Sequence, residues 1–297
     1  MVVVPTWRKS AVILGMKSSK LLFWAIVAGV APIAFATPAA AEMAAAPSRP
    51  TPDILQDYTY GYAPVVMTAT RSVNTAVPDA SSSPGRAPID QFARLKMLAT
   101  PAARLVRRPN ADTLYTLAWF DLAKEPIVLH VPDTAGRYYL IPLYDAYSNE
   151  FASIGSRTTG NGEGDFAIVG PLWQGQLPKT LQIVSAPTDH VWVIARTLVR
   201  GGPDLANTLV LTSQYQLVPL SAYPQFHATG DYSPPINVPV IRPNPDFVGA
   251  PITSSPGVWK PGFFEILAET ALRNPPSSSQ AQQADQLVRD GLLARTS

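Results

Sequence analysis

The sequence contains no cysteine, and this absence excludes three kinds of chemistry. The chain can form no disulfide, offers no thiol nucleophile and has no cysteine to carry a lipid. Its stability must therefore come from packing. Histidine is also scarce. The three imidazoles, His130, His190 and His227, show no HExxH or similar zinc spacing, which favours core or surface positions over ligand positions.

Several catalytic motifs are missing as well. The sequence has no GxxxxGK[ST] phosphate loop, and Ser153 and Ser156 lack the GxSxG pattern of many serine hydrolases. Asn161, Glu163 and Asp165 do not complete an EF-hand loop, because its glycine and late glutamate are absent. The sequence is still compatible with a Ser-His-Asp triad, since the three residues of a triad need not be close in sequence.

Acidic residues are absent before Glu42, and this region resembles an export signal. Lys17 and Lys20 form a positive segment, residues 21–36 an apolar run, and residues 39–41 a small-residue cleavage site; Met16 is an alternative start. An uncleaved anchor is the other interpretation, but the run falls short of the ~20 residues that a spanning helix needs. We expect a signal peptide over 1–41 and a bacterial periplasmic or secreted protein.

The net charge argues against nucleic acid as a partner. The whole chain carries 23 basic and 21 acidic residues, and four of the basic residues precede Glu42. The mature chain would therefore be slightly negative, whereas a phosphate-binding surface needs a basic excess.

Composition divides the rest of the chain into four parts. We expect a disordered leader over 42–50, a β-sandwich domain over 51–222, a Pro-rich arm over 223–261 and a helical tail over 262–297. The proline density of the arm predicts extended structure, and the tail predicts helices over 263–273 and 280–293, separated by the linker NPPSSS.

Extended structure is predicted from Thr113 onward. The run 114–120 is apolar on both faces, which suits a strand buried on both sides. Similar runs bounded by turn residues predict strands at 126–131, 137–144, 151–155, 166–169, 181–185 and 190–199. This pattern predicts a mainly β fold, specifically an antiparallel immunoglobulin-like β-sandwich with peripheral helices.

Helices are predicted on either side of these strands. Thr51 and Pro52 begin one, whose length Gly61 and Pro64 should limit. Residues 74–88 read as loop, and 89–98, with Phe92, Leu95 and Met97 facing inward, could form a short helix. Another helix should begin at Asp204 and end near Pro219. Four tryptophans can stack on sugars but in a β core mostly pack: Trp119, Trp173, Trp192 and Trp259.

Several blocks carry a resemblance to a known family. They are RPNADTLY (108–115), EPIVLHVPD (125–133), GRYYLIPLYDAYSNEFASIGSRTTG (136–160), DFAIVGP (165–171), RTLVRGGPDL (196–205) and PLS (219–221). They resemble the bacterial domain-of-unknown-function family 1254 (DUF 1254). The resemblance implies an immunoglobulin-like β-sandwich and no established activity. Relatives commonly continue into a second, jelly-roll-like domain of family 1214, to which the arm and tail would be the lead-in; a partner chain would then replace that domain.

Polar side chains gather at predicted strand ends. Asn110 and Asp112 precede the first long strand and Tyr115 lies in it, while Asp145 follows a later strand. Arg157 lies in the glycine-rich loop 155–165, where converging amides and a guanidinium could hold an anion. We predict a ligand-binding site made of these five residues. The alternative is that they satisfy turns and loop amides, and that the loop is a long hairpin.

The same carboxylates suggest two chemical roles. Asp112, Asp145 and Glu150, together with Asn149, supply oxygen ligands of the kind that calcium and other divalent cations prefer. Asp112 or Asp145 could instead act as a catalytic base, with Arg107 and Arg108 as partners or as solvated charges. A polar turn is the simpler reading of 145–150.

Three functions follow from these observations. The first is an exported ligand-binding or accessory envelope protein whose partner is a small molecule or an anion. The second is a hydrolase with an Asp-activated water, with or without a metal. The third is a structural protein whose Pro-rich arm mediates assembly, as a homo-oligomer or with another chain.

Overall fold

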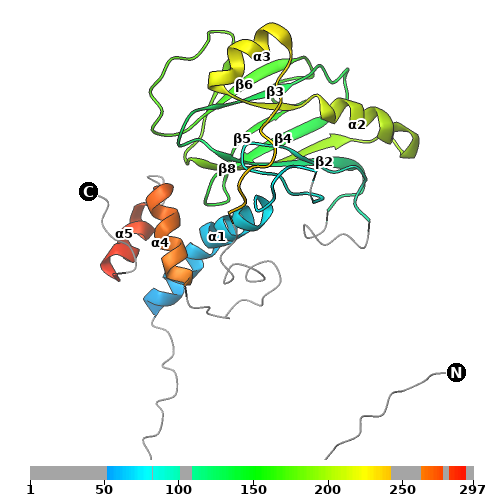
Figure 1. The fold of residues 1–297 in the computed structure, drawn as a ribbon. Helices are drawn as coiled ribbons and strands as arrows, with labels where there is room; N and C mark the ends of the chain where they lie inside the picture. Colours follow the sequence, from blue (N-terminus) through cyan, green and yellow to red (C-terminus); the bar gives the residue numbers. More distant parts are fainter. Residues whose placement is uncertain (1–51, 82, 101–108, 242–261, 277–280, 292–297) are drawn as a thin grey trace, which may run out of the picture. The chain divides into compact units, whose positions relative to one another are not determined.

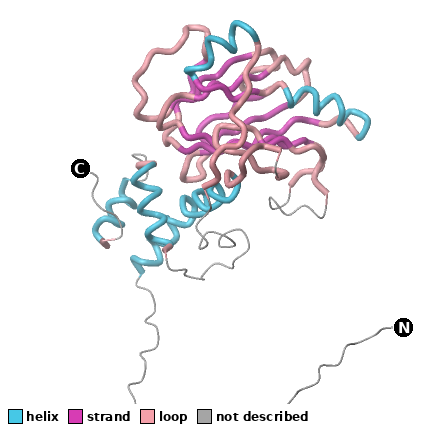
Figure 2. Tube along the Cα trace, in the orientation of Figure 1, coloured by secondary structure: helices cyan, strands magenta, loops and turns pink. Residues whose placement is uncertain are grey.

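The computed structural model describes residues 52–81, 83–100, 109–241, 262–276 and 281–291. The predicted signal peptide and leader, Arg107, Arg108, Trp259 and the arm beyond Ile241 lie outside these residues. Figures 1 and 2 show strands gathered in one region and helices at several places along the chain. The helices are α1 (Pro52–Asn74), α2 (Leu205–Ser213), α3 (Tyr223–Thr229), α4 (Phe263–Arg273) and α5 (Ala281–Arg289), with short 3-10 turns η1 (Gly202–Asp204) and η2 (Leu220–Ala222). The strands are β1 (Ala93–Arg94), β2 (Thr113–Asp121), β3 (Ile127–Val131), β4 (Tyr139–Tyr144), β5 (Glu150–Gly155), β6 (Gly164–Val169), β7 (Gln182–Ser185), β8 (His190–Leu198) and β9 (Gln216–Pro219).

The strands form two sheets, so the mainly β prediction is confirmed. The five-stranded sheet has the order β1-β2-β8-β4-β5 and is antiparallel throughout. The four-stranded sheet has the order β7-β6-β3-β9, and its β6–β7 pair is parallel. The prediction of a wholly antiparallel fold was therefore wrong at β7, because the direction of a strand depends on the crossover before it and not on its own residues.

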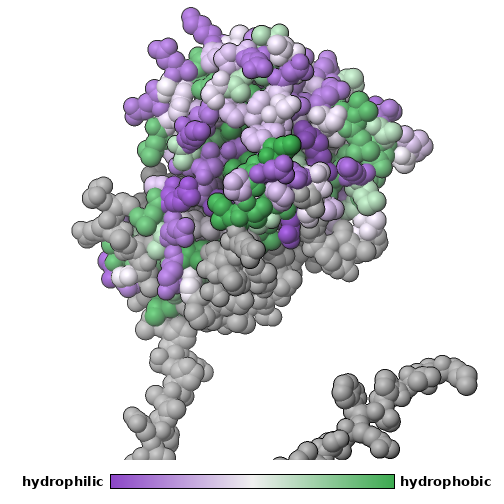
Figure 3. Space-filling view, in the orientation of Figure 1, coloured by the Kyte–Doolittle hydropathy of each residue, from purple (hydrophilic) through white to green (hydrophobic). Residues whose placement is uncertain are grey.

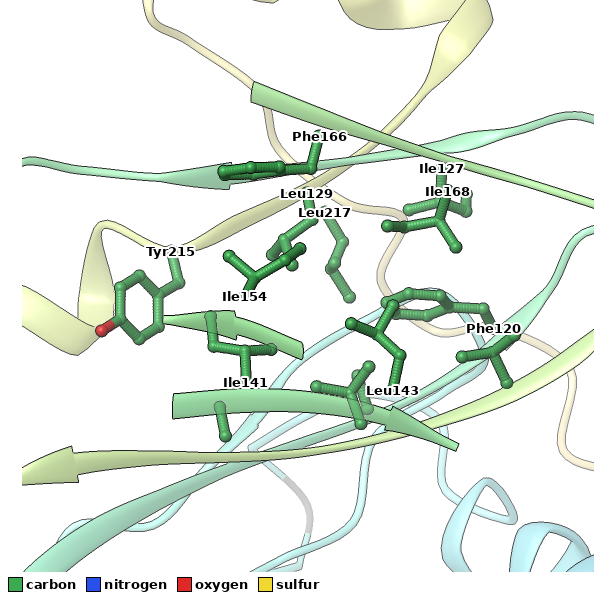
Figure 4. Close-up of a cluster of buried hydrophobic side chains, with 14 of the residues drawn as sticks. Phe120, Ile127, Leu129, Ile141, Leu143, Ile154, Phe166, Ile168, Tyr215 and Leu217 are labelled. Atoms are coloured by element: carbon green, nitrogen blue, oxygen red, sulfur yellow. The ribbon is translucent and has the colours of Figure 1, made fainter. Parts of the chain in front are cut away.

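A single apolar core lies between the two sheets. Alternate residues of each strand point inward, so Phe120 and Leu143 of one sheet pack with Leu129 and Phe166 of the other (Figure 4). All four side chains are almost completely buried. Each fully buried side chain of this size contributes about 1.5–3 kcal/mol, so this core supplies much of the stability that a chain without disulfides requires.

The seven predicted strands are all present, with small differences at their ends. β2 is buried along both faces, as predicted. The sequence pattern missed β1 and β9, and the helix predicted over 89–98 was wrong. Phe92 does point inward, but Met97 is exposed and the chain there adds β1 to the edge of β2. The pairing of β1 with β2 at the edge of the five-stranded sheet could not be predicted from local periodicity.

Helix α1 is longer than predicted. It continues through Gly61 and Pro64 and ends at Asn74. Gly61 is required by close helix packing, since a Cβ there would lie 2.6 Å from the Cδ2 of Leu267 in α4. Val65 joins Leu267 in a small core that also includes α5. Packing against α4 and α5 therefore offsets the low helix propensity of glycine and proline.

Two more predicted boundaries were wrong. α2 ends at Ser213 rather than near Pro219, because Gln216 to Pro219 instead pair with β3 as β9. Residues 223–229 of the predicted arm form α3, with its proline in the first turn, where no backbone donor is needed. Residues 230–241 contain no helix or strand, as expected.

The residue that directly follows α4, Asn274, is buried and links this helix to the five-stranded sheet; we call it the Asn274 latch. Asn274 is fully buried, and its Oδ1 accepts a hydrogen bond from the backbone N of His190 at the start of β8, at 2.9 Å. Its Nδ2 lies 3.0 Å from Nδ1 of the same histidine, and its backbone O accepts from the hydroxyl of Tyr147. The first residue of NPPSSS, the segment expected to separate two helices, therefore joins α4 to the five-stranded sheet.

None of the described helices is long and apolar enough to cross a membrane.

Candidate functional site

Asn110 and Tyr115 meet at the start of β2. The Oδ1 of Asn110 accepts hydrogen bonds from the backbone N and the hydroxyl of Thr113, at 3.0 and 2.6 Å, and its own N donates to the Tyr115 hydroxyl. Asp112 is exposed, and its backbone O accepts from Val199. At this end of the strand the side chains therefore satisfy local backbone groups.

Asp145 lies at the opposite end of the same sheet. β2 begins opposite the end of β8, at Leu198, whereas Tyr144 is paired near the beginning of β8, at Trp192. The buried Asp145 carboxylate accepts hydrogen bonds from the backbone N of Tyr147 and of Asn149, and from the Asn149 side chain. It closes the β4–β5 turn, and Glu150 beside it is exposed.

Arg157 is exposed and lies over the ring of Tyr138, 5.5 Å from its centroid. The loop around it is not a hairpin, because it connects β5 in one sheet to β6 in the other. The backbone N groups of residues 158–160 all donate to the carbonyl of Gly155. These amides are therefore used within the loop and do not converge on an anion.

The predicted residues do not form one cluster. Asn110, Tyr115 and Asp112 share one sheet end, while Asp145, Asn149 and Glu150 occupy the other. Among the residues that the structure describes, no group of three or more His, Cys, Asp or Glu side chains could hold a metal ion. Any role of these individual residues in ligand binding stays a prediction.

The outer face of the four-stranded sheet contains a different cluster. Register pairs His130 in β3 with Asp165 in β6 on one side and with Gln216 in β9 on the other. All three point away from the core, because their neighbours Leu129, Phe166 and Leu217 point into it. His130 Nδ1 lies 2.8 Å from Asp165 Oδ1.

Helix α3 completes this cluster. Figure 1 shows α3 lying over β3 and β6, and the helix packs on an apolar patch there through Tyr223 and Phe226. The Tyr223 hydroxyl donates to Asp165 Oδ2 at 2.8 Å and lies 3.2 Å from Nδ1 of His227. The ring of Phe226 packs edge-on against His130, with centroids 5.2 Å apart. One carboxylate is therefore shared by an imidazole and a phenol.

The polar groups border an open pocket of about 380 Å³. Its lining combines the cluster with residues from three neighbouring segments: His130, Glu163, Asp165, Ser213, Gln214, Gln216, Phe226, His227 and Gly230. Small-molecule sites commonly have volumes of roughly 300–1,000 Å³. The pocket is large enough for a compact ligand.

Electrostatics keep Asp165 ionised. Burial raises the pKa of this carboxyl, but the hydrogen bonds from His130 and Tyr223 outweigh it, so the net pKa is lowered. Burial, reinforced by the neighbouring Asp165 charge, raises the pKa of Tyr223 to about 12. Asp165 can therefore only accept hydrogen bonds, so the proton on His130 must be on Nδ1 when the imidazole is neutral. Its Nε2 then carries the lone pair.

Part of this site can be predicted from the sequence. Alternation in IVLHV places His130 opposite the inward-facing residues of β3, which predicts an outward imidazole. Its partners come from residues 165, 216 and 223–230, and only tertiary pairing brings these together. For Glu163 and Asp165 the local sequence suggests no role beyond an incomplete EF-hand loop.

The tryptophans support packing rather than ligand stacking. Trp119 and Trp192 are stacked with centroids 5.0 Å apart and an interplanar angle of 7° on the outer face of the five-stranded sheet. Trp173 packs on the apolar patch under α3.

Residues 89–219 match the family described as "Protein of unknown function (DUF1254)". This segment belongs to DUF1254. The DUF1254 segment includes His130, Asp165 and Gln216, whereas Tyr223 and His227 lie just beyond it. The family description records no activity.

Two solved structures are similar to this chain. The VPA0106 protein from Vibrio parahaemolyticus aligns with a TM-score of 0.57 and 23% identity, covering 83% of this chain and 53% of its own. An uncharacterised protein from Burkholderia cenocepacia aligns over 45% of this chain and 36% of its own, with 11% identity and a TM-score of 0.30. The first likeness shows the fold alone, and this chain spans about half the length of that protein. Comparison with curated proteins found no match.

Proposed function

We propose that this DUF1254 protein is an exported binding protein whose ligand is a small polar molecule held in the pocket beside His130. The observation that carries the proposal is the convergence of four hydrogen-bonding groups from β3, β6, β9 and α3 on one open pocket. Gln214 and Gln216 offer amide donors and acceptors, and Phe226 offers an apolar surface. The immunoglobulin-like class of the sandwich is part of the same proposal.

Ligand binding in the pocket can be tested by placing a large side chain at its entrance. Ser213, at the exposed end of α2, lines the pocket, so Ser213→Trp should obstruct it. Val210 lies on the same helix, is 62% exposed and does not line the pocket, which makes Val210→Trp a matched control. Figure 3 shows a hydrophobic patch over α2 within a largely hydrophilic surface, so an added indole at 210 changes the surface little.

The probes are a panel of monosaccharides, amino acids and dicarboxylates, examined by ligand-observed NMR with the full-length protein. We expect at least one compound to bind the wild type and Val210→Trp, and to lose at least tenfold in affinity with Ser213→Trp. Binding that Ser213→Trp leaves intact would place the ligand elsewhere, and a panel without binders would contradict this ligand class.

Export rests on the N-terminal sequence pattern. N-terminal sequencing of the protein from the periplasm or medium of its bacterial host is expected to begin at Glu42, after the small residues 39–41. A chain that begins at Met1 or Met16 would contradict cleavage. Lysing the cells and sequencing the retained fraction is the control, because it contains uncleaved precursor if export is blocked.

A further inference from the structure

We propose that His130 is a general base in this pocket, positioned by Asp165, and that the substrates are small esters attacked by water. The inference rests on the proposed pocket and adds a reaction to it. It replaces Asp112 and Asp145, the carboxylates that the sequence suggested as water activators, because one is an exposed loop residue and the other closes a turn.

The first argument is the orientation of the imidazole. Asp165 Oδ1 lies 2.8 Å from His130 Nδ1 and fixes the tautomer with Nε2 unprotonated. Asp165 is itself held on its other oxygen by the Tyr223 hydroxyl. This is the arrangement by which a carboxylate orients a histidine base and stabilises the imidazolium that forms on proton transfer.

The second argument is access. His130 retains 14% of its side-chain exposure and lines the open pocket, so its ring can be reached from solvent. His190 provides the contrast within the same chain: its Nε2 is buried, 3.7 Å from Asp121, and borders none of the described pockets. Only the first of these two histidine–aspartate pairs can meet a substrate.

The third argument is the set of polar groups around His130, which includes neutral donors that could stabilise an oxyanion. The groups that face His130 are Asp165 on β6, the neutral Gln216 on β9, and Tyr223 and His227 on α3, with Glu163 at the pocket edge. Gln216 lies directly across from His130, and the side-chain amides of Gln214 and Gln216 are neutral donors of the kind that stabilise a developing oxyanion.

The reaction balances without a further reactant. Nε2 takes one proton from water while the water oxygen forms a bond to the acyl carbon. The ester C–O bond then breaks, its electron pair leaves with the alcohol oxygen, and that oxygen takes the proton back from the imidazolium. The products are a carboxylic acid and an alcohol.

The kinetic test uses 4-nitrophenyl acetate with the full-length protein, and follows release of 4-nitrophenolate. His130→Gln is expected to lower the rate above the buffer background by about 100-fold, in the range of general-base effects. Asp165→Asn should lower it by about tenfold, and Val210→Trp should leave it unchanged. A rate that His130→Gln does not change would overturn the proposal.

Two readouts separate catalysis from a structural role. Asp165→Asn should lower kcat while leaving KM within about twofold of the wild type; a change in KM alone would count against positioning. Long-range ¹H–¹⁵N spectra should show His130 with its proton on Nδ1, and only three histidines need assignment. A proton on Nε2 would contradict the assignment directly.

The binding and catalytic proposals fail separately. If Ser213→Trp abolishes binding of the panel while His130→Gln leaves ester hydrolysis unchanged, the pocket stands and the base is wrong. If Ser213→Trp changes neither binding nor hydrolysis, the pocket itself is wrong.

Discussion

Replacing Asn274 with alanine is expected to lower the free energy of unfolding by about 4 kcal/mol. The substitution removes the acceptor for the backbone N of His190 and the donor to its ring, and both bonds are buried. An orphaned buried donor costs about 1–3 kcal/mol, and the small cavity adds to that cost. Urea denaturation followed by circular dichroism measures the change.

Asn207→Ala is the matched control for this prediction. Asn207 is an exposed residue of α2, so its replacement should change the free energy of unfolding by less than about 0.5 kcal/mol. Equal effects of the two substitutions would show that the Asn274 latch contributes little. The hydrogen bond that the Tyr147 hydroxyl donates to the backbone O of residue 274 can persist in the variant, so the measured loss reports the Asn274 side chain.

Asp90→Asn is expected to stabilise the protein at alkaline pH, by about 2 kcal/mol at pH 9 and by almost nothing at pH 4. Burial raises the pKa of Asp90 to about 7, with the charges of Asp121 and Glu125 adding to the rise. Its Oδ1 accepts from the Asp121 backbone N, and asparagine preserves that acceptor. The residue has a φ of 60°, which asparagine also adopts readily.

The sign follows from proton binding. Between about pH 4 and 7 the folded state holds the Asp90 proton that the unfolded state has released, so stability falls as the pH rises through this window. Above about pH 7 the wild type has lost this contribution completely, whereas Asp90→Asn has no carboxyl proton to lose. Chemical denaturation of both proteins at pH 4 and pH 9 isolates the difference. A pH-independent difference would mean that Asp90 does not titrate as its surroundings imply.

Strands were predictable because their signal is local. Each predicted strand is a short apolar run with turn residues at its ends, and the two-sided burial of β2 is visible in its own residues. The parallel direction of β7 and the edge pairing of β1 depend on how each strand meets its partner, β6 or β2, and not on the residues of the strand itself. The course of α1 through Gly61 and Pro64 likewise depends on α4, some 200 residues later.

The candidate site was harder to predict for the same reason. Polar residues at strand ends attract attention in a sequence, yet Asn110 and Asp145 are engaged in their own turns at opposite ends of one sheet. His130 and Asp165 were each visible, but their cross-strand register was not. Asn274 looked like the first residue of a linker, because nothing local marks it as buried.

The pairing of α1 with α4 sets the order in which the protein can fold. The hydroxyls of Thr68 and Thr270 lie 2.7 Å apart although 202 residues separate them, and the apolar side of α1 finds its cover in α4 and α5. While a ribosome still holds the C-terminal segment, α1 lacks the cover of α4 and α5, and its apolar side stays available to chaperones. The sheets can form first, and the helical core closes only after α4 and α5 have emerged.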